Sequence, residues 1–355
     1  MENTITTQNE LDALPLDTRG YINITGNIET FNHVFKNAFV RVIDNAVIKN
    51  HNGGTIEYVF NKAVIKNHNG GKIGNVCDNA VIKNHNGGKI DNVCDNAVIK
   101  NHNGGWINWV SGSAVIENHN GGNIYKVRDN AVIENNNGGW INGVCDYAVI
   151  ENHNGGWIGR VYDNAVIKNN NGGMIYYVYG NAVIENNNGG TIYNVYDKAV
   201  INTTGGTIYH KINETNITIN NNGGTVIAIQ PCDNTFEWFK NSFPIETSGD
   251  CATLYKAVRI RKRDGKYISD YKDNFEYIIG KEITEKVDTD VNNECSFGIH
   301  ISHKHWAIEF GCEWPDIAIL EMKVLIKDIV IPTKCDGKVR TSKAFVTREL
   351  PQSEW

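Results

Sequence analysis

The sequence predicts a mainly β protein: a β-solenoid (β-helix) with about 17 residues per coil, followed by a small α+β C-terminal domain. Three observations lead to this prediction. Gly-Gly pairs recur with a constant 17-residue period from residue 53 to residue 189, nine times in all. The residues around these pairs are strand formers, mainly Val, Ile, Tyr and Thr. From about residue 251 the repeat is absent and ordinary mixed patterning begins.

The repeat has a consensus that runs x-Ala-Val-Ile-(Lys/Glu)-Asn-(His/Asn)-Asn-Gly-Gly-x-Ile-x-x-Val-x-(Asp/Gly). A period of 17 is too short for helical repeats, which need about 33 residues or more. Asn and Gly accept a left-handed backbone, so the Asn-Gly-Gly segment predicts a corner of the coil. We expect each coil to have three short faces.

Positions that are the same apolar residue in the repeat copies predict the core. Ala46, Ile48, Ile56 and Val59, with their equivalents, should point inward. Each should stack on the same residue of the next coil, about 4.8 Å away. The core is therefore expected to consist of columns of identical side chains.

Two further repeat positions predict features outside the core. The Asn50 and Asn52 copies should form amide ladders that bond one coil to the next. Val47 and its copies should point outward, because neighbouring positions point inward. An apolar column facing water would be unusual, so we expect it at a bend or on a face that packs on another subunit.

The chain divides into five segments: a disordered or extended N-terminus (1–20), an N-terminal cap (21–44), the solenoid (45–230), a capping helix with a linker (231–250) and the C-terminal domain (251–355). Caps are expected because a solenoid end exposes unpaired strand. The N-terminal cap is marked by larger apolar residues: Ile28, Phe31, Phe35, Phe39 and Val42. The aromatic segment 236–239, which follows Pro231, predicts the capping helix.

The C-terminal domain should contain a strand at 254–260, a hairpin turn at 263–266, a helix at 303–310 and strands at 317–325 and 338–347. About 100 residues suffice for one small domain.

Four segments of this region carry a resemblance: Leu254–Val258, Cys295–Ser302 with Ala307 and Phe310, Ile319–Val324, and Gly337–Arg340 before Val346. Together they resemble a small domain of unknown function that is common in bacteriophage and prophage proteins, often behind pentapeptide-type solenoid repeats. The resemblance covers residues 251–349 and implies a viral or mobile-element origin, without supplying a reaction. The 17-residue period departs from the five-residue unit of true pentapeptide repeats.

Gly298–Ser302, followed by Ala307 and Phe310, also resembles the strand-to-helix segment of mono-ADP-ribosyltransferases. Tyr255 would match the aromatic residue near the start of that fold. The resemblance implies that a late glutamate orients the ribose, and Glu349 has the matching place. The basic residue expected beside the first aromatic has no clear counterpart. The alternative is an ordinary strand, N-cap and helix, and we assign no catalytic residue.

Three histidines suggest a zinc site: His300, His303 and His305, with Cys295 and Cys312 nearby. His300 and His305 have a spacing found in zinc sites, but no close Cys pair accompanies them. A turn between strand and helix would scatter these side chains. We therefore predict no metal and no cofactor.

A basic cluster could contact phosphates: Arg259, Arg261, Lys262 and Arg263. From residue 250 onward, however, 17 basic residues are balanced by 18 acidic ones. A solvated hairpin is the simpler interpretation, and nucleic acid is not favoured as a partner.

The residue after the repeated Ile forms a column of charge: Lys49, Lys66, Lys83 and Lys100, then Glu117, Glu134 and Glu151, then Lys168 and Glu185. Like charges stand in blocks, which polarises the rod. Recent duplication of a solvated face would give the same pattern. We include the first four lysines among the candidate binding residues.

Aromatic residues gather after the Gly-Gly pairs of the later coils: Trp106, Trp109, Trp140, Trp157, Tyr176, Tyr177 and Tyr193. Large aromatics on a rigid face are typical of surfaces that bind a partner, a sugar or an unstacked base. Packing between coils is the alternative. Histidines also recur at one turn position of the repeat: His51, His68, His85, His102, His119 and His153, with Asn in their place at 136, 170 and 187. We expect these to be exposed turn residues.

The overall composition is mildly acidic, with a net charge of −6, which excludes a strongly basic nucleic-acid binder. The N-terminus has no signal-peptide pattern, and no apolar run is long enough to cross a membrane. The eight cysteines lack paired spacing, so we expect free thiols in a reducing cytoplasm.

These observations favour a non-enzymatic binding protein of phage or mobile-element type, acting inside a bacterial host. Its partner would be a host or viral protein; a homodimer and a carbohydrate ligand are left open. The alternatives are an ADP-ribosyltransferase-like effector and a structural or adhesive virion component.

Overall fold

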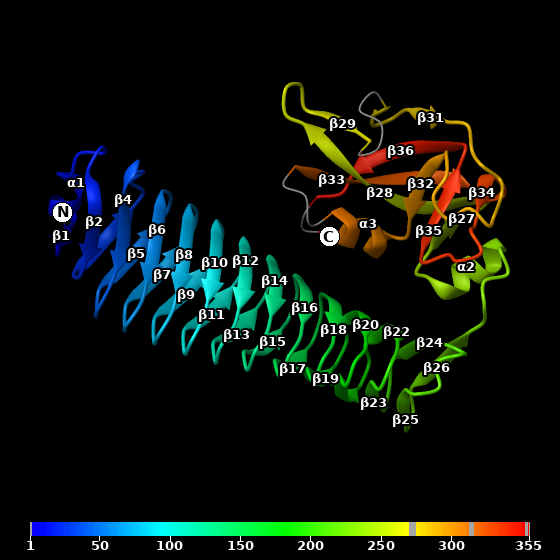
Figure 1. Ribbon diagram of the computed structural model, residues 1–355, viewed down its shortest axis with the longest axis horizontal. Coiled ribbons are helices and arrows are strands. Elements are labelled where there is room, and N and C mark those ends of the chain that lie inside the picture. The colour runs from blue at the N-terminus through cyan, green and yellow to red at the C-terminus, as the bar shows by residue number, and fades with distance from the viewer. Residues whose placement is uncertain (1, 270–274, 312–315, 352–353, 355) are drawn as a thin grey trace. The chain divides into compact units, whose positions relative to one another are not determined.

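A computed structural model describes residues 2–269, 275–311, 316–351 and 354; the side chains of His305 and Glu309 are not described. The chain divides into two compact units, Met1–Ile227 and Ala228–Trp355. The first is a β-solenoid and the second is a small sheet-rich domain, as the sequence predicts (Figure 1).

The solenoid has two sheets, which corrects the expectation of three faces. Sheet A contains β1 (Glu2–Ile5), β2 (Arg19–Ile24), β4 (Asn37–Val42), β6 (Thr55–Val59), β8 (Lys72–Val76), β10 (Lys89–Val93), β12 (Trp106–Val110), β14 (Asn123–Val127), β16 (Trp140–Val144), β18 (Trp157–Val161), β20 (Met174–Val178), β22 (Thr191–Val195), β24 (Thr207–Lys211) and β26 (Thr225–Ile229). Sheet B contains β3 (Asn27–Phe31), β5 (Val47–His51), β7 (Val64–His68), β9 (Val81–His85), β11 (Val98–His102), β13 (Val115–His119), β15 (Val132–Asn136), β17 (Val149–His153), β19 (Val166–Asn170), β21 (Val183–Asn187), β23 (Val200–Thr203) and β25 (Thr218–Asn221). In the regular part of the rod, each coil consists of two five-residue strands and the two corners that join them.

Identical residues of successive coils lie side by side in parallel register. Ile48 pairs with Ile65, for example, and Ile56 pairs with Ile73. Ala46, Ile48, Ile56 and Val59 are all fully buried, which confirms the predicted core. In β5 and β6 the two inward-facing residues are three positions apart. One outward-facing residue precedes the first of them, and two outward-facing residues lie between them.

The two corners explain the Gly and Asp positions of the consensus. The second Gly of each pair has a positive φ in most coils, for example +81° at Gly105. At the opposite corner, φ is +56° at Asp78 and Asp95 and +65° at Gly112. Asp, Asn and Gly are the residues that adopt this left-handed conformation most readily.

The N-terminal cap begins earlier than predicted. Residues expected to be disordered or extended form β1 and helix α1 (Gln8–Asp12), with Leu11 fully buried. The Gln8 side-chain oxygen accepts hydrogen bonds from the backbone N–H groups of Glu29 and Thr30, at 3.1 and 3.0 Å. These bonds satisfy donors on the edge strand β3. Phe39, expected in the cap, is 53% exposed.

Asparagine side chains form the predicted ladders along the rod. Asn67 donates to Asn50 at 3.0 Å, and Asn69 donates to Asn52 at 2.9 Å. The same bonds recur from coil to coil down to Asn186 and Asn188. Each amide is thereby donor to one neighbour and acceptor for the next, which fixes the coil register.

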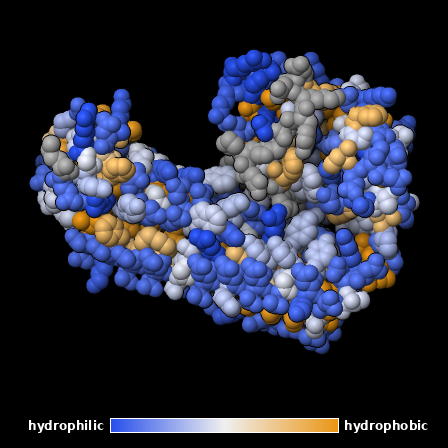
Figure 2. Space-filling model, viewed as in Figure 1, coloured by the Kyte–Doolittle hydropathy of each residue, from blue (hydrophilic) through white to orange (hydrophobic). Residues whose placement is uncertain are grey.

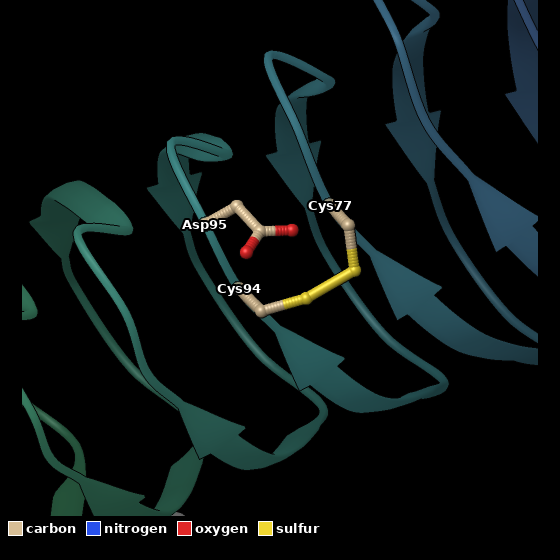
Figure 3. A group of neighbouring side chains, drawn as sticks. All are labelled: Cys77, Cys94 and Asp95. Atoms are coloured by element: carbon tan, nitrogen blue, oxygen red, sulfur yellow. A yellow bond between two sulfur atoms is a disulfide. The ribbon is translucent and has the colours of Figure 1, made fainter.

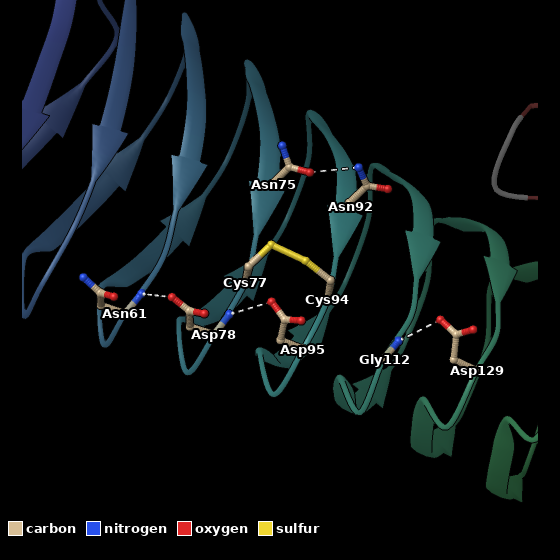
Figure 4. The surroundings of a disulfide bond; sticks show 9 residues. All are labelled: Asn61, Asn75, Cys77, Asp78, Asn92, Cys94, Asp95, Gly112 and Asp129. Atoms are coloured by element: carbon tan, nitrogen blue, oxygen red, sulfur yellow. Dashed lines mark hydrogen bonds between the residues drawn. A yellow bond between two sulfur atoms is a disulfide. The ribbon is translucent and has the colours of Figure 1, made fainter.

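One pair of cysteines corrects the expectation of free thiols. Cys77 and Cys94 occupy the same position of adjacent coils, 4.8 Å apart at Cα, and are joined by a disulfide (Figure 3). Around it, carboxylates of Asp78 and Asp95 accept hydrogen bonds from the backbone of the preceding corner (Figure 4). The disulfide therefore reinforces a corner that is already bonded coil to coil.

We expect reduction of this disulfide to lower the free energy of unfolding of the rod by about 3 kcal/mol, the value for a cross-link that closes a loop of this size. Thermal unfolding with and without dithiothreitol measures the effect. The Cys94→Ser variant should match the reduced wild type and should not respond to reductant. Equal melting temperatures for the oxidised and reduced wild type would contradict the prediction.

The C-terminal unit is built on a ten-stranded, mainly antiparallel sheet. Its elements are α2 (Phe236–Ser242), β27 (Glu246–Ser248), β28 (Cys251–Arg261), β29 (Lys266–Ile268), β30 (Glu276–Tyr277), β31 (Glu282–Thr284), β32 (Ile299–Ser302), α3 (Lys304–Gly311), β33 (Ile317–Leu325), η1 (Ile326–Asp328), β34 (Ile329–Val330), β35 (Lys338–Thr341) and β36 (Lys343–Glu349). The long strands β28 and β33 pair at its centre.

Helix α2 forms where the sequence predicts a helix. Phe239 is fully buried and belongs to the core of the C-terminal unit, together with Phe243. The helix is thus part of the second unit, whose core includes aromatic residues that precede its first long strand.

Candidate functional site

An aromatic strip lies on the outer side of sheet A, over strands β12 to β24. Trp109 contacts Tyr125 edge-on, with 5.7 Å between ring centroids, and the Arg128 guanidinium lies 4.6 Å from the centroid of the Trp109 ring. Further along, Tyr193 and Tyr209 stack at 5.0 Å. The strip combines aromatic rings with cations on a rigid sheet.

The predicted aromatic residues differ in exposure. Trp106, Trp109, Trp157 and Tyr177 are partly exposed. The others are buried: Trp140 is 7% exposed, Tyr176 is 3% exposed and Tyr193 is 8% exposed. Burial raises the pKa of Tyr193 above its usual range. Only the partly exposed residues are available for binding in this structure.

The candidate lysines lie on a different face from the aromatic residues. Lys49, Lys66, Lys83 and Lys100 project from strands of sheet B, whereas Trp106 and its neighbours project from sheet A. The sequence places both groups among the candidate binding residues, and the structure assigns them to different sheets. The reason is the Asn-Gly-Gly corner, which in each of these coils lies between the sheet B strand and the sheet A strand.

The charge column of sheet B contains ion pairs within the chain, and these form where a block of lysines meets a glutamate. Lys49 contacts Glu29 at 2.9 Å, and Lys100 contacts Glu117 at 3.3 Å. Lys168 contacts Glu151 at 2.8 Å. Within the blocks, like charges lie one coil apart.

Figure 2 shows a mostly hydrophilic visible surface on the solenoid, interrupted by short hydrophobic strips.

The histidine column is buried, which corrects the prediction of exposed turn residues. All six members have no exposed surface: His51, His68, His85, His102, His119 and His153. The first five rings stack at 4.7 to 4.8 Å between centroids. The column continues as Asn136, His153, Asn170, Asn187 and Thr203, which are also fully buried.

Burial and neighbouring rings lower the pKa of these histidines. Desolvation is the main cause, and it lowers the pKa of His51 and His153 to about 4, and that of His119 to about 3. Among the described residues, both ring nitrogens of His85 lack a hydrogen-bond partner. The signal in the sequence is spacing, because His51 follows Ile48 by three residues, just as Val59 follows Ile56.

The C-terminal unit contains a pocket of about 320 Å³. It is lined by Tyr255, Lys256, Ala257, Ser269, Phe275, Tyr277, Glu285, Cys295, Ser296, Phe297, Gly298, Ile299, His300, Ile301, Ser302, Trp306, Phe310 and Lys338. The structure thus brings together the segments 298–302 and Tyr255, which the sequence analysis singled out.

Two lysines shape the electrostatics of this pocket. Lys256 Nζ donates to the His300 carbonyl at 2.9 Å, and Lys338 Nζ lies 3.4 Å from Cys295 Sγ. Burial, followed by the charges of these lysines, lowers the pKa of His300 to about 4. His300 Nε2 is buried and has no hydrogen-bond partner among the described residues. The pocket suits a small, partly aromatic molecule with a polar or anionic group.

The glutamate implied by the transferase resemblance is not part of this pocket. Glu349 accepts a hydrogen bond from Tyr267 at 2.6 Å and does not line the cavity. Among the described lining residues, Glu285 supplies a carboxylate. The resemblance therefore extends to the segments around Tyr255 and Gly298, and not to the residue that would orient a ribose.

The other sequence candidates are separated or neutralised. His303 is fully buried against the Phe243 ring, 5.0 Å away, whereas His300 lines the pocket; Cys312 and the His305 side chain lie outside the described residues. In the basic cluster, Arg261 and Lys262 form ion pairs with Asp264 and Asp316. This supports a solvated hairpin over a phosphate site.

The two sheets and the repeated coil define a β-solenoid repeat protein. No family model and no solved structure matches the chain. Over 110 residues it is 34% identical to Gabija anti-defense 2 of Bacillus phage SPbetaL7; these residues are 30% of this chain and 26% of the relative. The chain therefore spans about a quarter of that relative's length, and the similarity relates it to a phage protein. In the part of the chain that the structure describes, no helix is long and apolar enough to span a membrane.

Proposed function

We propose that this chain is a non-enzymatic, phage-type interaction protein that acts inside a bacterial host and binds a protein of an anti-phage defence. The observation that carries the proposal is the aromatic strip on sheet A, in which Trp106 and Trp109 on β12 and Trp157 on β18 are partly exposed. The name of the phage relative supplies the class of partner.

The strip has the physical properties of a protein-binding surface. Trp and Arg are enriched among residues that dominate binding energy, and here Arg128 lies over Trp109. The strands beneath are fixed by coil-to-coil register, so little conformational entropy is lost when a partner docks. Rigid aromatic residues offer large contact area at low entropic cost.

Plating of phage on bacteria that carry the Gabija defence tests the proposal. Co-expression of the wild-type chain should restore plating, and the Trp106→Ala/Trp109→Ala/Trp157→Ala variant should lose at least tenfold of that effect. Tyr58→Ala is the matched control, because Tyr58 occupies the same column as Trp109 and is 46% exposed, three coils away. Full activity of the triple variant, with the protein present at wild-type level, would contradict the proposal.

The pocket favours a second candidate, a C-terminal domain that binds or modifies a small molecule. Labelled NAD incubated with the full chain and host lysate tests the transferase alternative. Label transfer that is lost in Glu285→Gln or Glu349→Gln would replace the binding proposal with an enzymatic one. Detection of the chain in purified virions would instead favour a structural or adhesive component, and binding to glycan arrays would favour a carbohydrate partner.

A further inference from the structure

The outer face of sheet B carries three parallel columns of side chains. One is valine: Val47, Val64, Val81, Val98, Val115, Val132, Val149, Val166, Val183 and Val200, all partly exposed. The second is the charge column, which begins with Glu29 on β3, because Ile28 pairs with Ile48 and Thr30 with Asn50. The third is the asparagine ladder. An unbroken apolar column beside a patterned column of charge marks this face as one that is covered.

The charge column is unfavourable within a single chain. Lys66 stands between Lys49 and Lys83, and Glu134 stands between Glu117 and Glu151. Like charges at directly paired strand positions destabilise a sheet. The described intrachain pairs of this column lie at block boundaries. An occupant that presents the opposite order of charges would relieve the repulsion.

A second copy of this chain presents that order. Consider a two-fold axis that runs along a strand of sheet B. Rotation about this axis places the outer face of sheet B of the second copy against that of the first and reverses the order of the coils. Each column of side chains then lies opposite the same column of the other copy. Valine then meets valine, asparagine meets asparagine, and the charge column meets itself in reverse.

We propose that two copies of this chain pack antiparallel through the outer faces of sheet B, with the two-fold axis along β11. In this register each charge from Glu29 to Lys168, except Lys100, faces its opposite in the second copy. The pairs are Glu29 with Lys168, Lys49 with Glu151, Lys66 with Glu134 and Lys83 with Glu117, each formed twice. Lys100 lies on the axis and is already paired with Glu117 of its own chain.

A neighbouring register is less favourable. An axis between β11 and β13 would pair Lys100 with Glu117, but it would also place Lys49 opposite Lys168 and Glu29 opposite Glu185. The charge pattern therefore selects both the antiparallel arrangement and the position of the axis.

The overlap is large enough for a specific dimer. It includes nine strands of sheet B, from β3 to β19. At about 4.8 Å between strands and about 3.3 Å per residue, the footprint is about 43 Å by 16 Å, or roughly 700 Å² on each copy. The total of about 1,400 Å² lies within the usual range for stable interfaces. The proposal is independent of the aromatic strip, which belongs to sheet A.

Charge exchange in the 355-residue chain tests the pairing. Sedimentation equilibrium of the wild type in 150 mM salt should give twice the chain mass of 39.6 kDa. Glu117→Lys should raise the dimer Kd at least tenfold, because it places like charges opposite Lys83 twice. Glu117→Lys combined with Lys83→Glu should restore the wild-type Kd. A monomeric wild type, or a double variant as weak as Glu117→Lys, would overturn the proposal.

Cross-linking tests the position of the axis. Only a residue on the axis faces itself, so Lys100→Cys should give a covalent dimer with a two-carbon bis-maleimide. Glu134→Cys should not, because its two copies lie four coils apart, about 19 Å along the rod. The wild-type chain with its native cysteines is the background. Cross-linking at 134 and not at 100 would overturn the register.

Two matched valine variants locate the face. Val115 lies inside the overlap and Val183 outside it, and both precede Ile-Glu-Asn in the sequence. Val115→Lys should weaken the dimer at least tenfold, and Val183→Lys should leave its Kd unchanged. Equal effects of the two variants, with circular dichroism spectra like the wild type, would mean that the dimer uses another surface and would overturn the proposal.

Discussion

We expect the solenoid to lose most of its stability between pH 6.5 and pH 5. The six histidines of the buried column are neutral in the folded rod, because burial lowers their pKa, to about 4 at His51 and His153. In the unfolded chain each histidine has an ordinary pKa of about 6.5. Below that pH the unfolded state therefore binds more protons than the folded state, so stability falls as the pH falls.

The expected magnitude is large. At pH 5, protonation of the unfolded state disfavours folding by about 2 kcal/mol for each histidine that stays neutral when folded. Six histidines give roughly 12 kcal/mol, which is comparable with the whole free energy of unfolding of a typical domain. Urea unfolding followed by circular dichroism at pH 7.5, 6 and 5 measures the change.

A variant with asparagine at the six positions isolates the column. Asn already occupies this position at 136, 170 and 187, where it is fully buried, so the substitution suits the interior. His300 and His303 remain in the variant, and burial lowers the pKa of each of them as well. The difference between the two proteins therefore reports on the rod. A wild type as stable at pH 5 as at pH 7.5 would contradict the prediction.

The sequence predicted the coil length and the apolar core because the same inward-facing residue recurs once in every coil. Ile48 and Ile56 can recur in every copy of the repeat only if the equivalent residues lie above one another. The sequence did not predict that each coil has only two strands, because the number of strands in a coil depends on the geometry of its corners. Asp78 and Asp95 supply the second corner through a positive φ, and a single Asp is a weaker signal than Gly-Gly.

The misplacement of the histidines has a physical explanation. A polar residue beside a Gly-Gly corner is usually solvated, and strict alternation would point His51 outward if Ile48 points inward. The strand instead has two consecutive outward residues, Lys49 and Asn50, before the chain turns inward again. For the aromatic residues, sequence spacing placed Trp106 and Trp140 in one column, but exposure depends on neighbours in space. Trp140 is buried and Trp106 is not.

The second large effect concerns the corner glycines, and Gly105→Ala should lower the free energy of unfolding by about 3 kcal/mol or more. Gly105 has a φ of +81°, and a Cβ there would lie 2.6 Å from the Gly88 carbonyl oxygen of the preceding coil. The backbone cannot yield easily, because that same oxygen accepts a hydrogen bond from the Trp106 N–H at 3.0 Å. A backbone shift that relieved the clash at this corner would break the hydrogen bond between the two coils.

Gly53→Ala is the matched control for Gly105→Ala. Gly53 has no positive φ, and a Cβ at this position would meet no atom within 4 Å, so its effect should stay within about 0.5 kcal/mol. Thermal and urea unfolding of both variants at pH 7.5 measure the difference. Gly53 and Gly105 differ in backbone conformation and in contact with the preceding coil. Equal effects of the two variants would therefore mean that stacking of successive corners does not limit the rod's stability.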